Sequence, residues 1–187
     1  ASERKTLTCA QCHVEYYFVP VANRVVHPLN WGSTAEEMYA YYRTKPNGFA
    51  ADFVHPVSGA PMLKAQHPDY EEFLGGVHAQ AGLSCSDCHM PDGSHHITSP
   101  LLTVEESCLK CHTGRTADWL ISRVKYNQDT LSGLQTQCGQ DIARTHQLVG
   151  ERAKRLPPRI LEQAREGLRE AQWYWDYVAA ANSMGAH

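Results

Sequence analysis

Residues 82–112 read GLSCSDCHMPDGSHHITSPLLTVEESCLKCH, a stretch that contains one pattern of two cysteines and a histidine twice. The pattern is Cys-x-x-Cys-His, and a further copy lies near the start of the chain. The three copies are Cys9-Ala-Gln-Cys12-His13, Cys85-Ser-Asp-Cys88-His89 and Cys108-Leu-Lys-Cys111-His112. Six of the seven cysteines therefore belong to one repeated pattern, which leaves only Cys138 outside it.

Cys-x-x-Cys-His is the attachment pattern of c-type haem. The two thiols bond to the vinyl groups of one porphyrin, and the histidine that follows supplies an axial nitrogen to its iron. We therefore expect three covalently attached haem c (heme) groups, and their attachment places the protein outside the cytoplasm. A zinc ribbon built from the second and third copies is an alternative, but it leaves Cys9 and Cys12 without partners. A disulfide framework would give the three histidines no role.

Composition narrows the class of protein further. The 187 residues are 42% hydrophobic and 20% charged, which is typical of one folded domain. The net charge is -3, and no basic stripe suggests a nucleic acid partner. No apolar run approaches the roughly 20 residues of a transmembrane segment. The chain opens with Ala-Ser-Glu-Arg-Lys and no signal peptide, so we expect a processed protein, an engineered chain or a fragment.

Each haem iron has a second axial position, and a second histidine there suits electron transfer. The other histidines of the chain are candidates for this ligand. Eight remain: His27, His55, His67, His78, His95, His96, His146 and His187. Met90 follows His89 directly, so we expect it to pack beside the porphyrin rather than bind the opposite side of the same iron.

The pattern of apolar residues predicts a mainly α fold, with short helices and loops around haems and a C-terminal pair of long helices. We expect a haem-binding region over residues 1–115 and a helical hairpin over 116–187. Its helices are predicted at 117–155 and 159–182, separated by Pro157-Pro158. Earlier, short helices are expected after capping boxes at 33–36 and 103–106, and after Pro68. No strand pair is predicted.

The second long helix has an apolar seam with heptad spacing. It consists of Leu161, Ala164, Leu168, Ala171, Trp175 and Val178. The seam would either cover haems within one subunit or form a dimer interface, and we favour the dimer. Cys138, at a helical position, is expected to be a small buried hydrophobe.

Several longer segments resemble one family. They are residues 12–18 (CHVEYYF), 61–68 (PMLKAQHP), 88–91 (CHMP), 171–173 (AQW) and 182–185 (NSMG). In this order they look like the ammonia-forming cytochrome c nitrite reductases, periplasmic pentahaem enzymes that are usually homodimers and take electrons from a quinol-linked cytochrome. The resemblance runs along the whole chain and covers only the C-terminal part of the family's length.

The resemblance implies a role for individual residues. Glu15 and Gln66 resemble side-chain ligands of a calcium ion, to which Tyr16 and Lys64 would add backbone carbonyls. Tyr16 and His67 resemble the side chains that face nitrite. The implied iron ligands are proximal His13, His89 and His112, distal His78 for the haem at Cys108 and Cys111, distal His187 for the haem at Cys85 and Cys88, and His95 for a haem attached outside this chain.

These roles suit the chemistry of the residues. Calcium prefers carboxylate, amide and carbonyl oxygens. Reduction of nitrite to ammonium uses six electrons and eight protons, and a histidine and a tyrosine hydroxyl hold oxygens and relay protons. Considered singly, Glu15 could be a surface carboxylate, Tyr16 could pack on a porphyrin and His67 could cap a helix. We expect His27, His55, His96 and His146 to be structural or surface residues.

The sequence departs from the family in the haem motifs that it contains. The family's catalytic haem is attached through Cys-x-x-Cys-Lys, and this chain has no such motif. A second motif with two histidine ligands is also missing, and both would lie before Ala1. We expect a fragment of the enzyme with little nitrite reductase activity by itself. The alternatives are a non-catalytic trihaem electron-transfer protein and part of an octahaem nitrite reductase.

Overall fold

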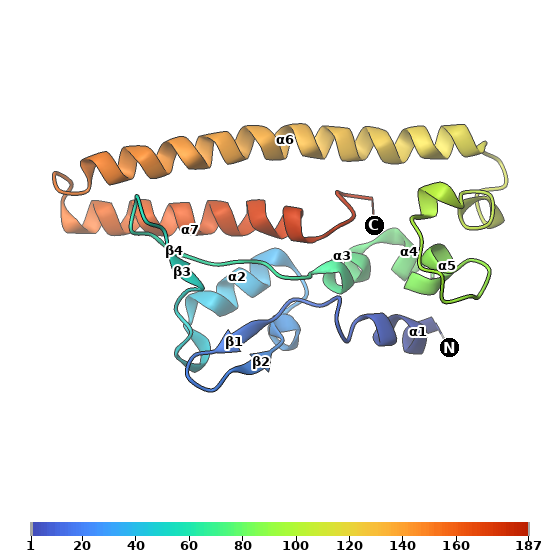
Figure 1. Cartoon of the computed structure of the whole chain (residues 1–187), viewed down its shortest axis with the longest axis horizontal. Coiled ribbons are helices and arrows are strands. Elements are labelled where there is room, and N and C mark those ends of the chain that lie inside the picture. Colours follow the sequence, from blue (N-terminus) through green and yellow to red (C-terminus); the bar gives the residue numbers. More distant parts are fainter. Residues whose placement is uncertain (1, 187) are drawn as a thin grey trace.

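The computed structural model describes residues 2–186, with side chains from residue 5 onward. Two long helices, α6 (Ala117–Arg152) and α7 (Pro158–Ala180), lie side by side and form a hairpin along one edge of the molecule (Figure 1). At a rise of about 1.5 Å per residue, the 36 residues of α6 span about 54 Å. Most of the shorter elements lie beyond α7, on the side away from α6 (Figure 1). This arrangement confirms the predicted mainly α fold.

The shorter helices are α1 (Ser2–Cys9), α2 (Ala35–Arg43), α3 (Asp69–Gly75), α4 (Val77–Gln80) and α5 (Cys85–His89). Four 3-10 turns accompany them: η1 (Pro28–Trp31), η2 (Pro46–Gly48), η3 (Pro100–Leu102) and η4 (Cys108–Lys110). As predicted, a short helix follows Pro68, because α3 starts at the next residue. We also expected a helix from a capping box at 103–106, and this is wrong. That segment forms turns that lead into η4.

Two short antiparallel hairpins contradict the prediction that the chain has no strand pair. In the first, β1 (Tyr17–Val19) pairs with β2 (Arg24–Val26), with Phe18 opposite Val25. In the second, β3 (Phe53–Val54) pairs with β4 (Pro61–Met62). Strands of two or three residues are too short to show an alternating pattern. The turn between β1 and β2 also has no glycine to mark it in the sequence, and its positive φ angles occur at Val21 and Asn23.

Helix α2 starts one residue later than the sequence suggested. Thr34, not Ser33, is the capping residue: its Oγ1 accepts a hydrogen bond from the backbone N of Glu37 at 3.2 Å. The Glu37 carboxylate in turn accepts from the backbone N of Thr34 at 3.1 Å. This reciprocal pair satisfies backbone donors that a helix start otherwise leaves without partners.

The two long helices contact each other along the predicted seam. The indole N–H of Trp175 donates to the backbone oxygen of Gln135 in α6 at 2.8 Å. A Cβ atom built onto Gly139 would lie 3.0 Å from that indole nitrogen, so a glycine lets the two helices approach. Within one chain, therefore, the seam packs α7 against α6. Cys138 is exposed, so the prediction that it is buried is wrong.

An aromatic core joins α2, the first hairpin and the C-terminal half of α7. We call it the aromatic platform, and it consists of Tyr17, Val19, Met38, Tyr39, Tyr41, Tyr42, Phe49, Leu63, Ala65, Trp173 and Tyr177. Trp173 is fully buried, and its ring meets that of Tyr42 edge-on with 5.2 Å between centroids. Its indole N–H donates to the backbone oxygen of Ala35 at 2.9 Å. The platform thereby fixes the segments that carry residues 14–19 and 61–66.

Candidate functional site

Each Cys-x-x-Cys-His motif forms a single helical turn. The backbone N of His13 donates to the oxygen of Cys9 at 3.0 Å, and that of His112 donates to the oxygen of Cys108 at 2.9 Å. The remaining motif is helix α5 itself. One turn brings both thiols and the imidazole of a motif to the same side of the backbone. All six thiols are free of disulfide bonds, so each motif has the donors that a c-type haem requires.

The three motifs are neighbours in space. Helix α1, which ends at the first cysteine of the first motif, lies beside α5, which is the second motif (Figure 1). Burial, reinforced by the Cys9 thiol, raises the pKa of Cys85 to about 11. Burial likewise raises the pKa of Cys88, with further contributions from Cys108 and Cys111. The second motif therefore lies between the other two.

One histidine pair has the spacing of two ligands to one iron. The ring centroids of His78 and His112 lie 6.3 Å apart, with an angle of 85° between their planes. Two imidazoles on opposite sides of a metal, each with a bond of about 2 Å, have ring centres roughly 6 Å apart. This spacing fits the pairing that the resemblance implies. His95 is exposed in the loop after α5, and His187 lies outside the described residues.

The zinc alternative receives no support from the described part of the chain. Within residues 2–186, no group of three or more His, Cys, Asp or Glu side chains is arranged to hold a metal ion. The four thiols of the second and third motifs therefore do not converge as zinc ligands do.

Two of the motif histidines, both predicted iron ligands, have a fixed ring orientation. His13 Nδ1 lies 2.9 Å from Asp69 Oδ2, and His89 Nδ1 lies 3.0 Å from the backbone oxygen of Thr98. Both acceptors are oxygens, so Nδ1 carries the proton and Nε2 is left as the metal-binding atom. No local pattern singles out Asp69, which is 56 positions from His13.

The buried carboxylate of Glu15 joins the two segments that resemble the family most closely. The side chain is fully buried, and its Oε2 accepts a hydrogen bond from the backbone N of Gln66 at 2.6 Å. Its Oε1 accepts from the Tyr42 hydroxyl at 3.1 Å. Burial raises the pKa of Glu15 to about 8, although these two hydrogen bonds oppose the rise. A buried carboxyl of this kind is well suited to a cation, which would favour its charged form.

The backbone from Pro61 to Gln66 is held by side chains from other elements. Arg169 Nη1 donates to the oxygen of Pro61 at 2.9 Å. Asp52 Oδ2 accepts from the backbone N of Lys64 at 2.8 Å, and Asp176 Oδ2 accepts from that of Ala65 at 3.0 Å. This extended segment therefore has a fixed conformation without belonging to a regular sheet beyond β4. Sequence reasoning missed all three anchoring residues, of which Arg169 and Asp176 lie more than 100 positions from their partners.

Tyr16 follows Glu15 in the chain, and His67 follows Gln66. The hydrogen bond between Glu15 and Gln66 therefore holds the segments that contain Tyr16 and His67 next to each other. Tyr16 is half-buried and packs edge-on against Phe18, with 5.7 Å between centroids. His67 is exposed, and its ring centroid lies 6.1 Å from that of His13. The structure thus places His67, one of the two predicted substrate-facing residues, beside a predicted iron ligand.

A second buried carboxylate, Glu71, lies next to this contact. Its Oε1 accepts from the backbone N of Glu15 at 3.0 Å, and burial raises its pKa to about 7. Among the described residues, Glu71 Oε2 is buried without a hydrogen-bond partner. Two buried carboxyl groups, those of Glu15 and Glu71, therefore lie close together, which favours a positive charge in their surroundings.

The fold and the three motifs define a multihaem c-type cytochrome. Comparison with known proteins identifies the family: the family model described as cytochrome c552 matches residues 1–187. The chain belongs to this cytochrome c552 family.

Individual relatives share the whole of this chain but extend well beyond it. The chain is 37% identical to the cytochrome c nitrite reductase subunit NrfA of Nitratidesulfovibrio vulgaris, over 100% of this chain and 41% of that protein. It is 38% identical to cytochrome c-552 of Parabacteroides distasonis, over 99% of this chain and 38% of the relative. The chain therefore spans about two fifths of the length of the curated relatives it matches.

A solved structure shows the same fold. The catalytic subunit NrfA of the cytochrome c nitrite reductase from Desulfovibrio desulfuricans superposes with a TM-score of 0.89 and 38% sequence identity. The match covers 98% of this chain and 43% of that subunit, which is described with two calcium sites.

Proposed function

We propose that this chain is part of an ammonia-forming cytochrome c nitrite reductase, and that Tyr16 and His67 face the nitrite. The observation that carries the proposal is the hydrogen bond between Glu15 Oε2 and the backbone N of Gln66. This bond joins the two segments that contain Tyr16 and His67, and the ring of His67 lies 6.1 Å from that of His13, a predicted iron ligand. The relatives named as cytochrome c nitrite reductases support the same function.

The residues of this chain supply binding and proton transfer. Haems bound at the three motifs would supply single electrons. The Tyr16 hydroxyl and the His67 imidazole both donate hydrogen bonds, so they hold the oxygens of a nitrite anion and pass protons to them. Because His67 is exposed, it also has access to protons from solvent. Such a pair of donors suits a reaction that consumes eight protons.

The test uses the natural protein that carries this chain, with its haems attached. His67→Ala removes a proton donor, and we expect the rate of ammonium formation from nitrite to fall by about 10²–10⁴-fold with reduced methyl viologen as electron donor. Tyr16→Phe keeps the ring, removes the hydroxyl and should also reduce the rate.

The matched control is His96→Ala, which removes an exposed histidine of the loop after α5 and should leave the rate unchanged. Wild-type protein that forms no ammonium, or a His67→Ala variant with the full rate, would refute the proposal.

We also propose a calcium ion held by the side chains of Glu15 and Gln66 and the carbonyls of Tyr16 and Lys64. A buried carboxylate, an amide and two backbone carbonyls are hard oxygen donors of the kind calcium prefers. On the side of Lys64 and Gln66, the backbone is held by Asp52 and Asp176.

Glu15→Gln tests the calcium site, because it keeps the size of the side chain and removes its charge. We expect the calcium content, measured by elemental analysis, to fall by one ion per chain while the haem absorbance is retained. Glu36→Gln, on the exposed face of α2, is the control and should keep the ion. Equal calcium contents in wild type and Glu15→Gln would contradict this assignment.

One observation favours a second candidate, a non-catalytic trihaem electron-transfer protein. All three motifs of this chain end in histidine, and none has the lysine of the family's catalytic haem. An electron carrier would be oxidised by a protein partner rather than by nitrite. The ammonium assay separates the two, because only the enzyme consumes six electrons for each nitrite.

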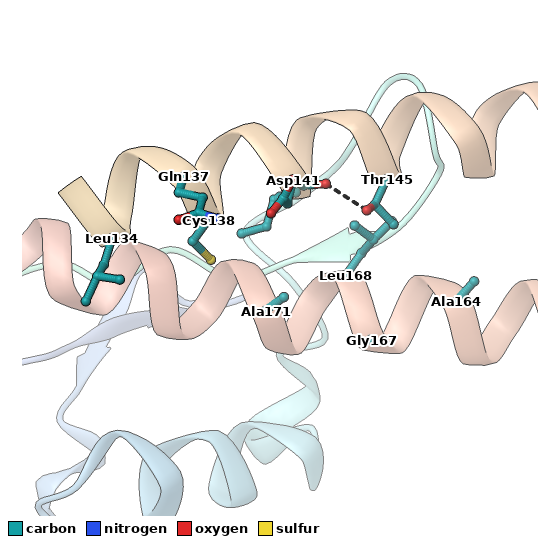
Figure 2. A pocket seen from close by; sticks show the side chains of 10 residues that line it. Leu134, Gln137, Cys138, Asp141, Thr145, Ala164, Gly167, Leu168 and Ala171 are labelled. Carbon is teal, nitrogen blue, oxygen red and sulfur yellow. Dashed lines mark hydrogen bonds between the residues drawn. The ribbon is translucent and has the colours of Figure 1, made fainter. Parts of the chain in front are cut away.

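We propose that two copies associate through the outer surface of α6 and α7. A groove of about 630 Å³ runs between the two helices (Figure 2). Its lining is Leu134, Gln137, Cys138, Asp141, Ile142, Thr145, Ala164, Gly167, Leu168 and Ala171. Within α6, only His146 and Val149 are buried in the chain, and Leu134 is 60% exposed. Sedimentation of the haem-loaded protein at several concentrations measures this assembly.

We further propose that the protein works in the periplasm and receives electrons from a quinol-linked cytochrome. Covalent attachment of c-type haem outside the cytoplasm supports this compartment. In the described residues, no helix combines the length and the apolar character needed to cross a membrane.

A further inference from the structure

The first haem motif and the start of α3 are joined by two hydrogen bonds. His13 Nδ1 lies 2.9 Å from the carboxylate oxygen Oδ2 of Asp69. The backbone N of Tyr70, the next residue, donates to the backbone oxygen of His13 at 3.0 Å. Side chain and main chain of the iron ligand are therefore both bound to α3, and the orientation of the imidazole is set by that helix.

The carboxylate of Asp69 is shielded from water. Its side chain is 11% exposed, whereas that of His13 is 59% exposed. Oδ1 accepts a hydrogen bond from the backbone N of Asn182 at 3.0 Å. The Asn182 amide Nδ2 lies 3.5 Å from Oδ1 and 3.4 Å from Oδ2. A carboxylate with little access to water interacts more strongly with a nearby donor than a solvated one does.

In the second motif, the acceptor bound to the histidine Nδ1 is uncharged. His89 Nδ1 is hydrogen-bonded at 3.0 Å to the backbone oxygen of Thr98, which is uncharged. Hydrogen bonds to an ionised acceptor are roughly twice as strong as those between neutral groups. The two motif histidines are thus held at similar distances, 2.9 Å and 3.0 Å, by acceptors of different charge.

We propose that Asp69 is a positioning residue which, through its hydrogen bond to His13, lowers the reduction potential of the haem attached at Cys9 and Cys12. A carboxylate that accepts the Nδ1 proton makes the imidazole a stronger donor to its metal. A stronger donor stabilises ferric iron more than ferrous iron, so the addition of one electron to this iron becomes less favourable. Hydrogen bonding to an axial ligand is one of the known means of tuning a haem.

This inference depends on haem attachment at Cys9 and Cys12 and does not depend on nitrite as the substrate. Loss of such a second contact typically weakens a metal interaction by about 10–100-fold. For a one-electron couple, a tenfold change in the preference for ferric iron corresponds to about 59 mV. We therefore expect a shift of roughly 60 mV or more when the carboxylate is removed.

The experiment is a redox titration of the haem-loaded protein, followed by EPR so that individual haems are resolved. Asp69→Asn keeps the size of the side chain and removes its charge, so one potential should rise by roughly 60 mV or more. Glu72→Gln is the matched control, because it removes an equal charge from the same helix without touching His13. It should shift that potential by less than half as much.

A second variant predicts a shift of the opposite sign. Asn182→Ala removes the amide donor that competes for Asp69 Oδ2, so the carboxylate interacts more strongly with His13 and the same potential should fall. Equal shifts in Asp69→Asn and Glu72→Gln would overturn the proposal, as would no shift in Asp69→Asn. If Asp69→Asn fails to retain its haem, an unchanged or higher potential in Asn182→Ala would overturn it.

Discussion

The aromatic platform and the motif loops, residues 76–115, differ in what holds their backbone in place. In the platform, helices and hairpins converge on eleven buried residues, with Trp173 at the centre. Within residues 76–115, only Ser84, Val104 and Ser107 are buried, and the longest helix, α5, has five residues. Packing between side chains fixes the platform, whereas the motif loops have few such contacts. We infer that attached haems supply much of the stability of the motif loops.

The largest expected effect separates the two regions directly. The double substitution Cys85→Ala and Cys88→Ala prevents haem attachment at the second motif. We expect backbone amide exchange in the motif loops to accelerate by at least about tenfold, because local stability follows local contacts. Exchange in α2 and the C-terminal half of α7 should not change.

Cys138→Ala is the control for this experiment, since Cys138 is an exposed cysteine outside every motif. It should leave exchange unchanged everywhere except near its own position. Equal acceleration in the platform and in the motif loops would show that the two regions do not differ as described.

A smaller effect is expected from opening the platform itself. Trp173→Ala removes a fully buried ring and the hydrogen bond to Ala35, so the free energy of unfolding should fall by about 3–5 kcal/mol. Denaturant unfolding monitored by circular dichroism measures the loss.

Trp119→Ala removes the same side chain from an exposed position, where it packs only partly and lies against Arg115. This control should cost at most about 1 kcal/mol. Similar losses in the two variants would mean that the platform is not the main source of stability.

The smallest expected effect concerns the start of α2, which supports the platform. Thr34→Ala breaks the capping box with Glu37 and should cost about 1 kcal/mol of unfolding free energy. Ser33→Ala should cost less than about 0.5 kcal/mol, because only the backbone N of Ser33 bonds to Glu37. If the Ser33 variant loses as much stability as the Thr34 variant, the capping residue has been misassigned.

The sequence was most informative where a pattern is local. The three motifs need only five consecutive residues each, and the long helices show a sustained apolar period. The helices were predicted at 117–155 and 159–182 and occur as Ala117–Arg152 and Pro158–Ala180. The resemblance to nitrite reductases added Glu15, Gln66 and His67, whose segments the structure brings together.

The rest of the site depends on contacts between residues far apart in the chain. Asp69 reaches His13 across 56 positions, and Asp176 reaches Ala65 across 111. No local pattern marks an aspartate as the partner of a particular histidine or backbone N–H. The hairpins were missed because each strand has only two or three residues. In each case the deciding interaction is tertiary, so it is visible only once the chain is folded.

The most direct test is to digest the protein with a protease and measure the mass of each peptide that contains a Cys-x-x-Cys-His motif. We predict that the peptides around Cys9, Cys85 and Cys108 each carry one haem, bound through both thiols. Free thiols in any of the three peptides, from a preparation with its full visible absorbance, would contradict the assignment of three haems to this chain.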